Sequence, residues 1–85
     1  MILTILFDST VFMTRQEIAP GVYRHFKGED YRVFWIARMS ENPDQEVVVY
    51  QKISTGEYWV RPVNMFVEQV MINDVAVPRF AFKHA

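Results

Sequence analysis

Hydrophobic residues recur along this chain in short runs with a period of two, and turn-forming residues separate the runs every eight to twelve positions or so. This spacing is typical of a small antiparallel sandwich or barrel. Between the turns there is no long segment with the 3.6-residue hydrophobic stripe of an amphipathic helix. The pattern therefore predicts an all-β domain over residues 19–82, built as a small antiparallel barrel of about five or six strands.

Each predicted strand is bounded by glycine, proline or polar turn residues. The predicted ranges are 22–26, 31–39, 46–53, 58–61, 67–72 and 75–82. Pro62 keeps Arg61 extended and suits the first position of a helical turn, so one short 3₁₀ or α turn is predicted over residues 63–66. Asn73-Asp74 forms a turn that tolerates positive φ, and Pro78 assigns the last strand to a sheet edge.

The strand predicted over residues 31–39 decides where the first tryptophan lies. Strict alternation puts Val33 and Trp35 on one face, and it puts Arg32 and Phe34 on the other. The face with the arginine is predicted to be the outer one, so Trp35 is expected in the core. No such argument orients Trp59, because the residues on both sides of it in sequence are also bulky.

Composition shows what must stabilise this domain. The chain has 85 residues, of which 51% are hydrophobic and 15% aromatic, and it has no cysteine. A domain of this length buries only roughly 60 to 65% of the surface of its unfolded chain. Since disulfides and thiolate metal sites are excluded, large aromatic side chains must supply most of the core.

The net charge and the terminal segments of the sequence limit the possible binding partners and the cellular location. The formal net charge of −1 gives no global attraction for nucleic acid or an anionic membrane. The apolar run at residues 1–7 lacks a basic leader and ends far short of the roughly 20 residues that span a bilayer. We expect a cytoplasmic protein without a membrane partner. Residues 1–18 are predicted to be an extension, either an edge strand or an artefact of an upstream start with Met13 rather than Met1 as the first residue, and residues 83–85 a tail.

No catalytic constellation stands out. Ser40 adjoins Glu41, but only His25 and His84 offer a base, and carboxylate pairs in turns have no environment that would separate their pKa values. The loop 41–46 lacks the glycine and the ligand spacing of a calcium site. We expect no enzyme activity, cofactor or metal, and keep an accessory or small enzyme domain around His25 and Glu41 as a minor alternative.

Arginine and aromatic residues alternate in several predicted strands, and arginine outnumbers lysine six to three. Such arginines commonly pack their stems over a sheet and pair with glutamates. The functional alternative is a recognition surface for a protein or peptide, or in second place for RNA or single-stranded nucleic acid. The candidate residues are Tyr23, His25, Arg38, Glu41, Tyr50, Trp59 and Arg61.

Several segments, in this order and spacing, resemble the bacterial domain of unknown function 1653. They are residues 20–28 (PGVYRHFKG), 31–33 (YRV), 37–38 (AR), 40–41 (SE), 48–51 (VVYQ), 59–62 (WVRP), 65–66 (MF) and 77–80 (VPRF). The resemblance implies a small SH3-like β-barrel with no established activity. Met39 stands where the family usually has histidine, so histidine chemistry is not expected there. An edge strand with Phe80 and Phe82 leaves both a monomer and an edge-paired dimer open.

Overall fold

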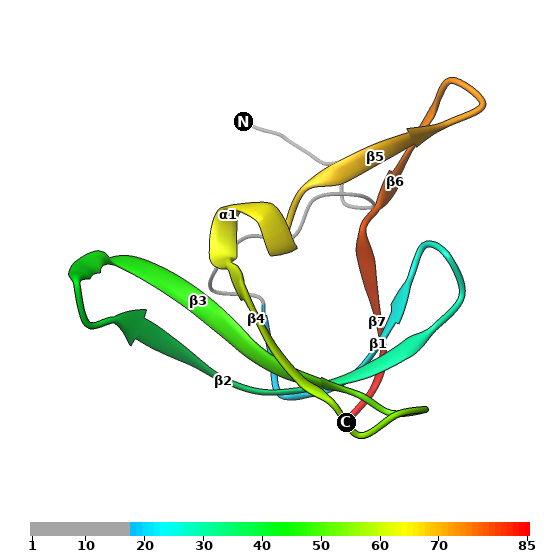
Figure 1. The fold of residues 1–85 in the computed structure, drawn as a ribbon. Helices are drawn as coiled ribbons and strands as arrows, with labels where there is room; N and C mark the ends of the chain where they lie inside the picture. The colour runs from blue at the N-terminus through cyan, green and yellow to red at the C-terminus, as the bar shows by residue number, and fades with distance from the viewer. Residues whose placement is uncertain (1–17) are drawn as a thin grey trace, which may run out of the picture.

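The computed structural model describes residues 18–85, which form two antiparallel sheets and one short helix (Figure 1). The predictions for residues 1–17, an edge strand or an artefact that precedes Met13, lie outside the described residues. The elements are β1 (Gly21–His25), β2 (Asp30–Met39), β3 (Asn42–Lys52), β4 (Tyr58–Pro62), α1 (Val63–Phe66), β5 (Gln69–Ile72), β6 (Val75–Pro78) and β7 (Phe80–His84). The all-β class is thus confirmed.

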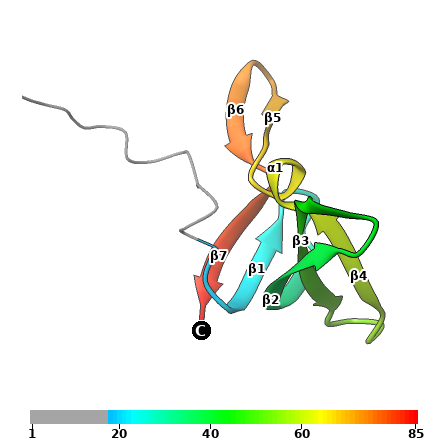
Figure 2. The same ribbon diagram turned by 90° about the vertical axis from the view of Figure 1, so that its left-hand side faces the viewer.

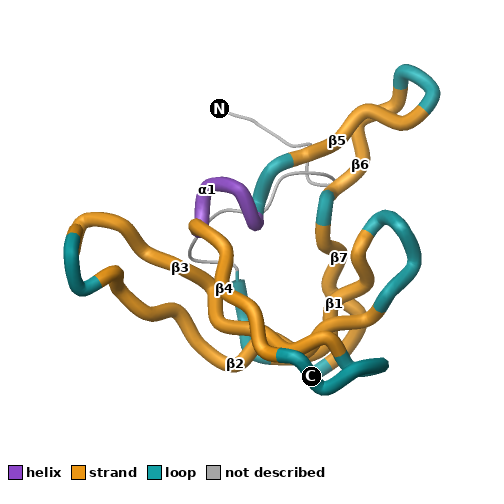
Figure 3. The backbone as a smooth tube through the Cα atoms, viewed as in Figure 1, coloured by secondary structure: helices purple, strands orange, loops and turns teal. Residues whose placement is uncertain are grey.

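The larger sheet has five strands in the order β4-β3-β2-β1-β7, and β5 pairs only with β6. Figure 3 shows the five-stranded sheet curling below α1, while the β5–β6 hairpin projects away from it. In the part of the chain from residue 18 onward, no ladder joins the two outer strands, β4 and β7. Among residues 18–85 the sheet is therefore curled but not closed by hydrogen bonds into a barrel, and β4 and β7 each pair on one side only.

Local turn chemistry is as predicted at two positions. Pro62 precedes the single turn of α1, and the hairpin between β5 and β6 places Asn73 and Asp74 at positive φ angles of 50° and 65°. Both results follow from backbone preferences of the residues concerned.

The segment predicted as one strand over residues 75–82 is two strands. β6 ends at Pro78, which cannot donate to a ladder, and Arg79 separates it from β7. Arg79 instead bridges the two sheets, since its N–H donates to the carbonyl oxygen of Glu68 and its carbonyl accepts from Phe26 N–H, both at 3.0 Å. β7 then continues to His84, beyond the predicted strand end, so most of the predicted tail is strand.

The core lies on the concave side of the five-stranded sheet and is largely aromatic. Phe66 of α1 stacks on Phe80 with ring centres 4.2 Å apart, and Tyr23 meets Phe66 edge to face. The Tyr23 hydroxyl donates to the carbonyl of Ala19 at 2.8 Å, which satisfies the polar end of this buried side chain. The buried residues of this cluster are Ile18, Tyr23, Val33, Val48, Tyr50, Phe66 and Phe80.

A register shift in β2 overturns the predicted position of Trp35. Val33 lies opposite Tyr50, but Trp35 lies opposite Val49, which leaves Phe34 as an extra residue in the ladder. Such a bulge interrupts alternation. Trp35 consequently points to the outer face and is 62% exposed, so the expectation that it lies in the core was wrong.

The orientation of β4, which the sequence left open, follows from its pairing with β3. Trp59 lies opposite Tyr50 and Arg61 lies opposite Val48, and both β3 residues are buried in the core. Cross-strand partners share a face, so Trp59 and Arg61 are on the concave side. Because β4 is an outer strand, the Trp59 side chain still keeps 48% of its surface exposed.

An ion triad on the exterior connects three strands. The carboxylate of Asp30 in β2 pairs with Arg24 of β1 and, at 2.9 Å, with Nζ of Lys83 in β7. The hydrogen bonds from Arg24 and then Lys83 lower the pKa of Asp30 to about 2.

We expect Asp30→Asn to lower the melting temperature at pH 7, because the neutral amide cannot pair with either cation. A carboxyl with a depressed folded pKa contributes stability above its unfolded pKa and loses that contribution as the pH falls through the folded value. The difference between the two proteins should therefore shrink between about pH 4 and pH 2. Thermal melts followed by circular dichroism across this range test it, and a constant difference would contradict it.

Candidate functional site

The structure separates the seven predicted binding residues into three groups. Tyr23 is fully buried and belongs to the core rather than to a surface. Arg38 and Glu41 lie at the turn between β2 and β3. The remaining four, His25, Tyr50, Trp59 and Arg61, gather around the buried ring of Phe80 and at the adjoining edge of the sheet.

The hydrogen bonds that Arg38 and Glu41 make within residues 18–85 are to neighbours in the sequence. Arg38 Nη1 donates to the carbonyl of Pro43 at 3.0 Å, and Ser40 donates its hydroxyl to Glu41 at 3.1 Å. Glu41 lies two residues after the end of β2 at Met39, whereas His25 lies near its other end, one residue after Arg24, which pairs with Asp30. The ten residues of β2 put roughly 25 to 30 Å between the two ends. His25 and Glu41 are therefore not brought together, and an acid–base site shared by them has no geometric basis.

Arg61 is half-buried and is held by two aromatic side chains. Its Nε donates to the hydroxyl of Tyr50 at 3.2 Å, and its guanidinium carbon lies 5.8 Å from the ring centre of Phe80. Trp59 lies two residues away on the same strand face. In the region that the structure describes, no carboxylate forms an ion pair with Arg61.

His25 borders the aromatic floor, the name we give to the mutually contacting rings of Tyr31, Tyr50 and Phe80. Its ring centre is 4.9 Å from that of Phe80 and 6.0 Å from that of Tyr31. Partial burial, and then the positive charges of Arg79, Arg61 and Lys27, lower the pKa of His25. The imidazole is therefore neutral at pH 7, and its Nδ1 accepts the backbone N–H of Lys27 at 3.2 Å. The proton consequently resides on Nε2.

Arg79 completes the group, which we call the basic–aromatic surface and define as His25, Tyr31, Trp59, Arg61 and Arg79. Arg79 Nη2 pairs with Glu68 Oε1 at 3.1 Å, so its charge is largely balanced. The sequence interpretation missed Tyr31 and Arg79 as members. The contact between His25 and Phe80 depends on the pairing of β1 with β7, which no local sequence pattern reveals.

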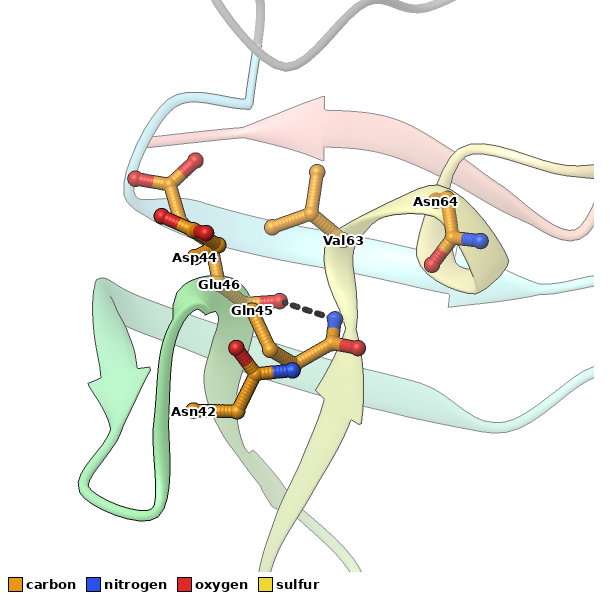
Figure 4. Close-up of a pocket in the computed structure, with 6 residues that line it drawn as sticks. All are labelled: Asn42, Asp44, Gln45, Glu46, Val63 and Asn64. Carbon is orange, nitrogen blue, oxygen red and sulfur yellow. Dashed lines mark hydrogen bonds between the residues drawn. The ribbon is translucent and has the colours of Figure 1, made fainter.

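A polar hollow of about 500 Å³ lies elsewhere, between the start of β3 and α1 (Figure 4). Its lining residues are Asn42, Asp44, Gln45, Glu46, Val63 and Asn64. Gln45 Nε2 donates to the carbonyl oxygen of Glu46 at 3.2 Å. Throughout residues 18–85, no group of three or more His, Cys, Asp or Glu side chains is arranged to hold a metal ion.

A second hollow, of about 400 Å³, lies between the β5–β6 hairpin and the adjoining part of β1. Ile72, Val77 and Pro78 line its apolar side, and His25 and Phe26 line the other. Figure 2 shows the hairpin standing out from the rest of the domain at this position. His25 therefore borders this hollow as well as the aromatic floor.

A third feature is an exposed hydrophobic patch on the outer face of the sheet. Trp35, Tyr58 and Val60 are all more than half exposed, and Phe34 contacts the rings of both Trp35 and Tyr58. The patch lies on the opposite face from Trp59, since Val60 pairs with Val49 and Trp35 does too. None of the helical segments described is long and apolar enough to cross a bilayer.

Comparison with known proteins identifies the family of this chain. Residues 21–82 match the family model described as a protein of unknown function, DUF1653. The fold is similar to the crystal structure of a DUF1653 protein from Bordetella bronchiseptica, with a TM-score of 0.74 and 33% sequence identity over 81% of this chain and 91% of that one. No curated protein matches the sequence. The chain belongs to the DUF1653 family, as its sequence segments led us to expect.

Proposed function

We propose that this domain is a non-catalytic binding module that recognises an extended peptide segment of a protein partner at strand β4. The observation that carries the proposal is the pairing of a half-exposed Trp59 with Arg61, whose guanidinium is held by Tyr50 and by the ring of Phe80. Tryptophan and arginine are the residues most enriched among the few that dominate binding energy at protein interfaces.

The position of β4 supports an extended partner. β4 is an outer strand of the five-stranded sheet, so its backbone groups on one side are free of ladder partners among the described residues. A peptide can add to such an edge as a further strand, with main-chain hydrogen bonds supplying affinity and side-chain contacts supplying specificity. Trp59 and Arg61 would then contact those alternate side chains of the peptide that point to the concave side.

The surface of Trp59 is favoured over the outer patch for a physical reason. Trp35, Tyr58 and Val60 offer apolar area without a fixed polar group that would orient a ligand. At β4 an apolar side chain and a positioned hydrogen-bond donor lie side by side, which is the usual composition of a specific binding site. We also propose that the domain is related to SH3-like barrels and is cytoplasmic. It would act either as a monomer or as a dimer paired through β7.

The test is selection of peptides from a random library displayed on phage, followed by titration of the synthetic peptides. We expect Trp59→Ala to weaken binding by at least about tenfold, as loss of a dominant interface residue does. Trp35→Ala is the matched control, because it removes an equally large exposed side chain from the opposite face. Peptides whose affinity depends on Trp35 and not on Trp59 would overturn the proposal.

RNA or single-stranded nucleic acid is the alternative ligand, since Arg61 and Trp59 offer charge and a stacking surface. The net charge of −1 and the single exposed tryptophan on this face disfavour it. Titration with a fluorescent oligonucleotide at two salt concentrations distinguishes a nucleic-acid ligand from a peptide ligand. Binding that needs Trp59 and weakens steeply with salt would replace the peptide proposal with this one.

A further inference from the structure

We propose that Arg61 is a carboxylate-binding residue, which takes one carboxylate of the peptide bound at β4. This inference rests on the proposed function and adds the chemical class of the group that is recognised. It draws on the geometry of the guanidinium, on the charges around it and on the aromatic floor beneath it.

The guanidinium is already oriented. Nε is used by the hydroxyl of Tyr50, and the planar group lies near the face of Phe80, so one side and one edge of the arginine are occupied. The two terminal nitrogens, Nη1 and Nη2, have no hydrogen-bond acceptor within residues 18–85. These two nitrogens form the end of the arginine fork, and their spacing matches the two oxygens of a carboxylate.

The charges near Arg61 fit an anion with a single negative charge. Arg79 is balanced by Glu68, and His25 is neutral at pH 7. Lys27 lies in the exposed turn after β1, with Nζ 5.8 Å from the ring centre of Phe26. Arg61 is thus the cation on the concave face of β4 that lacks an anionic partner in the described region. One unbalanced positive charge favours a carboxylate over a doubly charged phosphate.

The surroundings of Arg61 strengthen such a pair. Tyr31, Tyr50 and Phe80 contact one another through their rings and exclude water from one side of the guanidinium. An ion pair that is partly shielded from water gains more free energy than one on an open surface. The energetic advantage of an exposed arginine such as Arg32, on the outer face, would be much smaller.

The experiment uses an array of synthetic octapeptides, made as matched sets of three that differ only in the carboxylate. One member has an Asp or Glu side chain and an amidated C-terminus, the second has Asn or Gln and a free C-terminus, and the third is neutral at both positions. Affinities of the full chain are measured by fluorescence polarisation. Because the first two members carry their carboxylate in different places, they identify which source the site accepts.

With the unmodified protein, we expect the neutral member to bind roughly 10- to 100-fold more weakly than the better charged member, as for loss of a hydrogen bond to a charged group. With Arg61→Gln this difference should nearly vanish, and with Arg61→Lys it should be intermediate, since lysine keeps the charge without the fork. Arg32→Gln is the matched control and should leave the full difference in place.

The outcomes separate this inference from the proposed function. Peptides that bind in a Trp59-dependent manner but equally well without a carboxylate would overturn the role of Arg61 and leave the peptide-binding proposal standing. Absence of binding throughout the array would overturn both. The comparison of matched peptides on the unmodified protein decides the point even if an Arg61 variant does not fold.

Discussion

Phe80→Ala is expected to lower the free energy of unfolding by about 3 to 5 kcal/mol, the range for truncating a buried aromatic side chain. Phe80 is almost fully buried, stacks on Phe66 and contacts the rings of Tyr31 and Tyr50. Removing it takes away the contacts that join β7 to β1, β2, β3 and α1. Small domains have total stabilities near the lower end of about 5 to 15 kcal/mol, so this variant should be close to unfolded at 25 °C.

Urea denaturation followed by circular dichroism measures this loss, with Trp35→Ala as the control. Trp35 is the larger side chain, but it is mostly exposed on the outer face, and its truncation should change stability by less than about 1 kcal/mol. Similar losses for both variants would show that Trp35 is buried after all. The bulge at Phe34 would then be wrong, and with it the assignment of faces across β2 and β3.

Gly21→Ala is expected to have the second large effect on stability. Gly21 has a φ of +148°, and a Cβ atom there would lie 2.7 Å from the carbonyl oxygen of His84 and 2.9 Å from Cε1 of Phe82. The backbone conformation alone costs a residue with a side chain about 1 to 3 kcal/mol. The contact with a backbone atom of β7 adds to that cost, because β1 and β7 must move apart to relieve it.

Gly28→Ala separates these two contributions. Gly28 also has a positive φ, of +105°, but within residues 18–85 no atom other than those of its chain neighbours lies within 4 Å of where its Cβ would be. Its substitution should therefore show the backbone penalty without a clash. Differential scanning calorimetry should give a lower melting temperature for Gly21→Ala than for Gly28→Ala. The reverse order would argue against the close approach of β7 to the start of β1.

Local backbone preferences explain which parts of the fold could be predicted from the sequence. Pro62 determined the position of α1, and Asn73-Asp74 determined the β5–β6 turn, because each acts through its own φ and ψ preferences. Pro78 was expected to place one strand at a sheet edge; the segment is instead two strands, β6 and β7, and among the described residues each pairs on one side only. The bulge at Phe34 was not predictable, since nothing in the alternation of residues 31–39 marks where an extra residue enters the ladder.

The candidate site was predictable only as far as one strand extends. Trp59 and Arg61 are two residues apart on one strand, a spacing that by itself puts both side chains on the same face, as they are in the structure. The proximity of Arg61 to His25 depends on contacts between residues more than 25 positions apart, which arise only after β1, β2 and β7 have paired. The prediction that Tyr23 lies in a binding surface was wrong for a related reason. The local sequence pattern of an aromatic residue on a strand is the same whether its side chain faces the core or a partner.

Ligand recognition at β4 on the concave face can be followed through the two tryptophan indole N–H signals in a ¹H–¹⁵N NMR spectrum. A selected peptide is titrated into the labelled protein, and Trp35→Phe and Trp59→Phe assign the two signals. We expect the Trp59 signal to shift progressively to saturation while the Trp35 signal stays in place. A shift confined to Trp35 would place the ligand on the outer face and contradict this expectation.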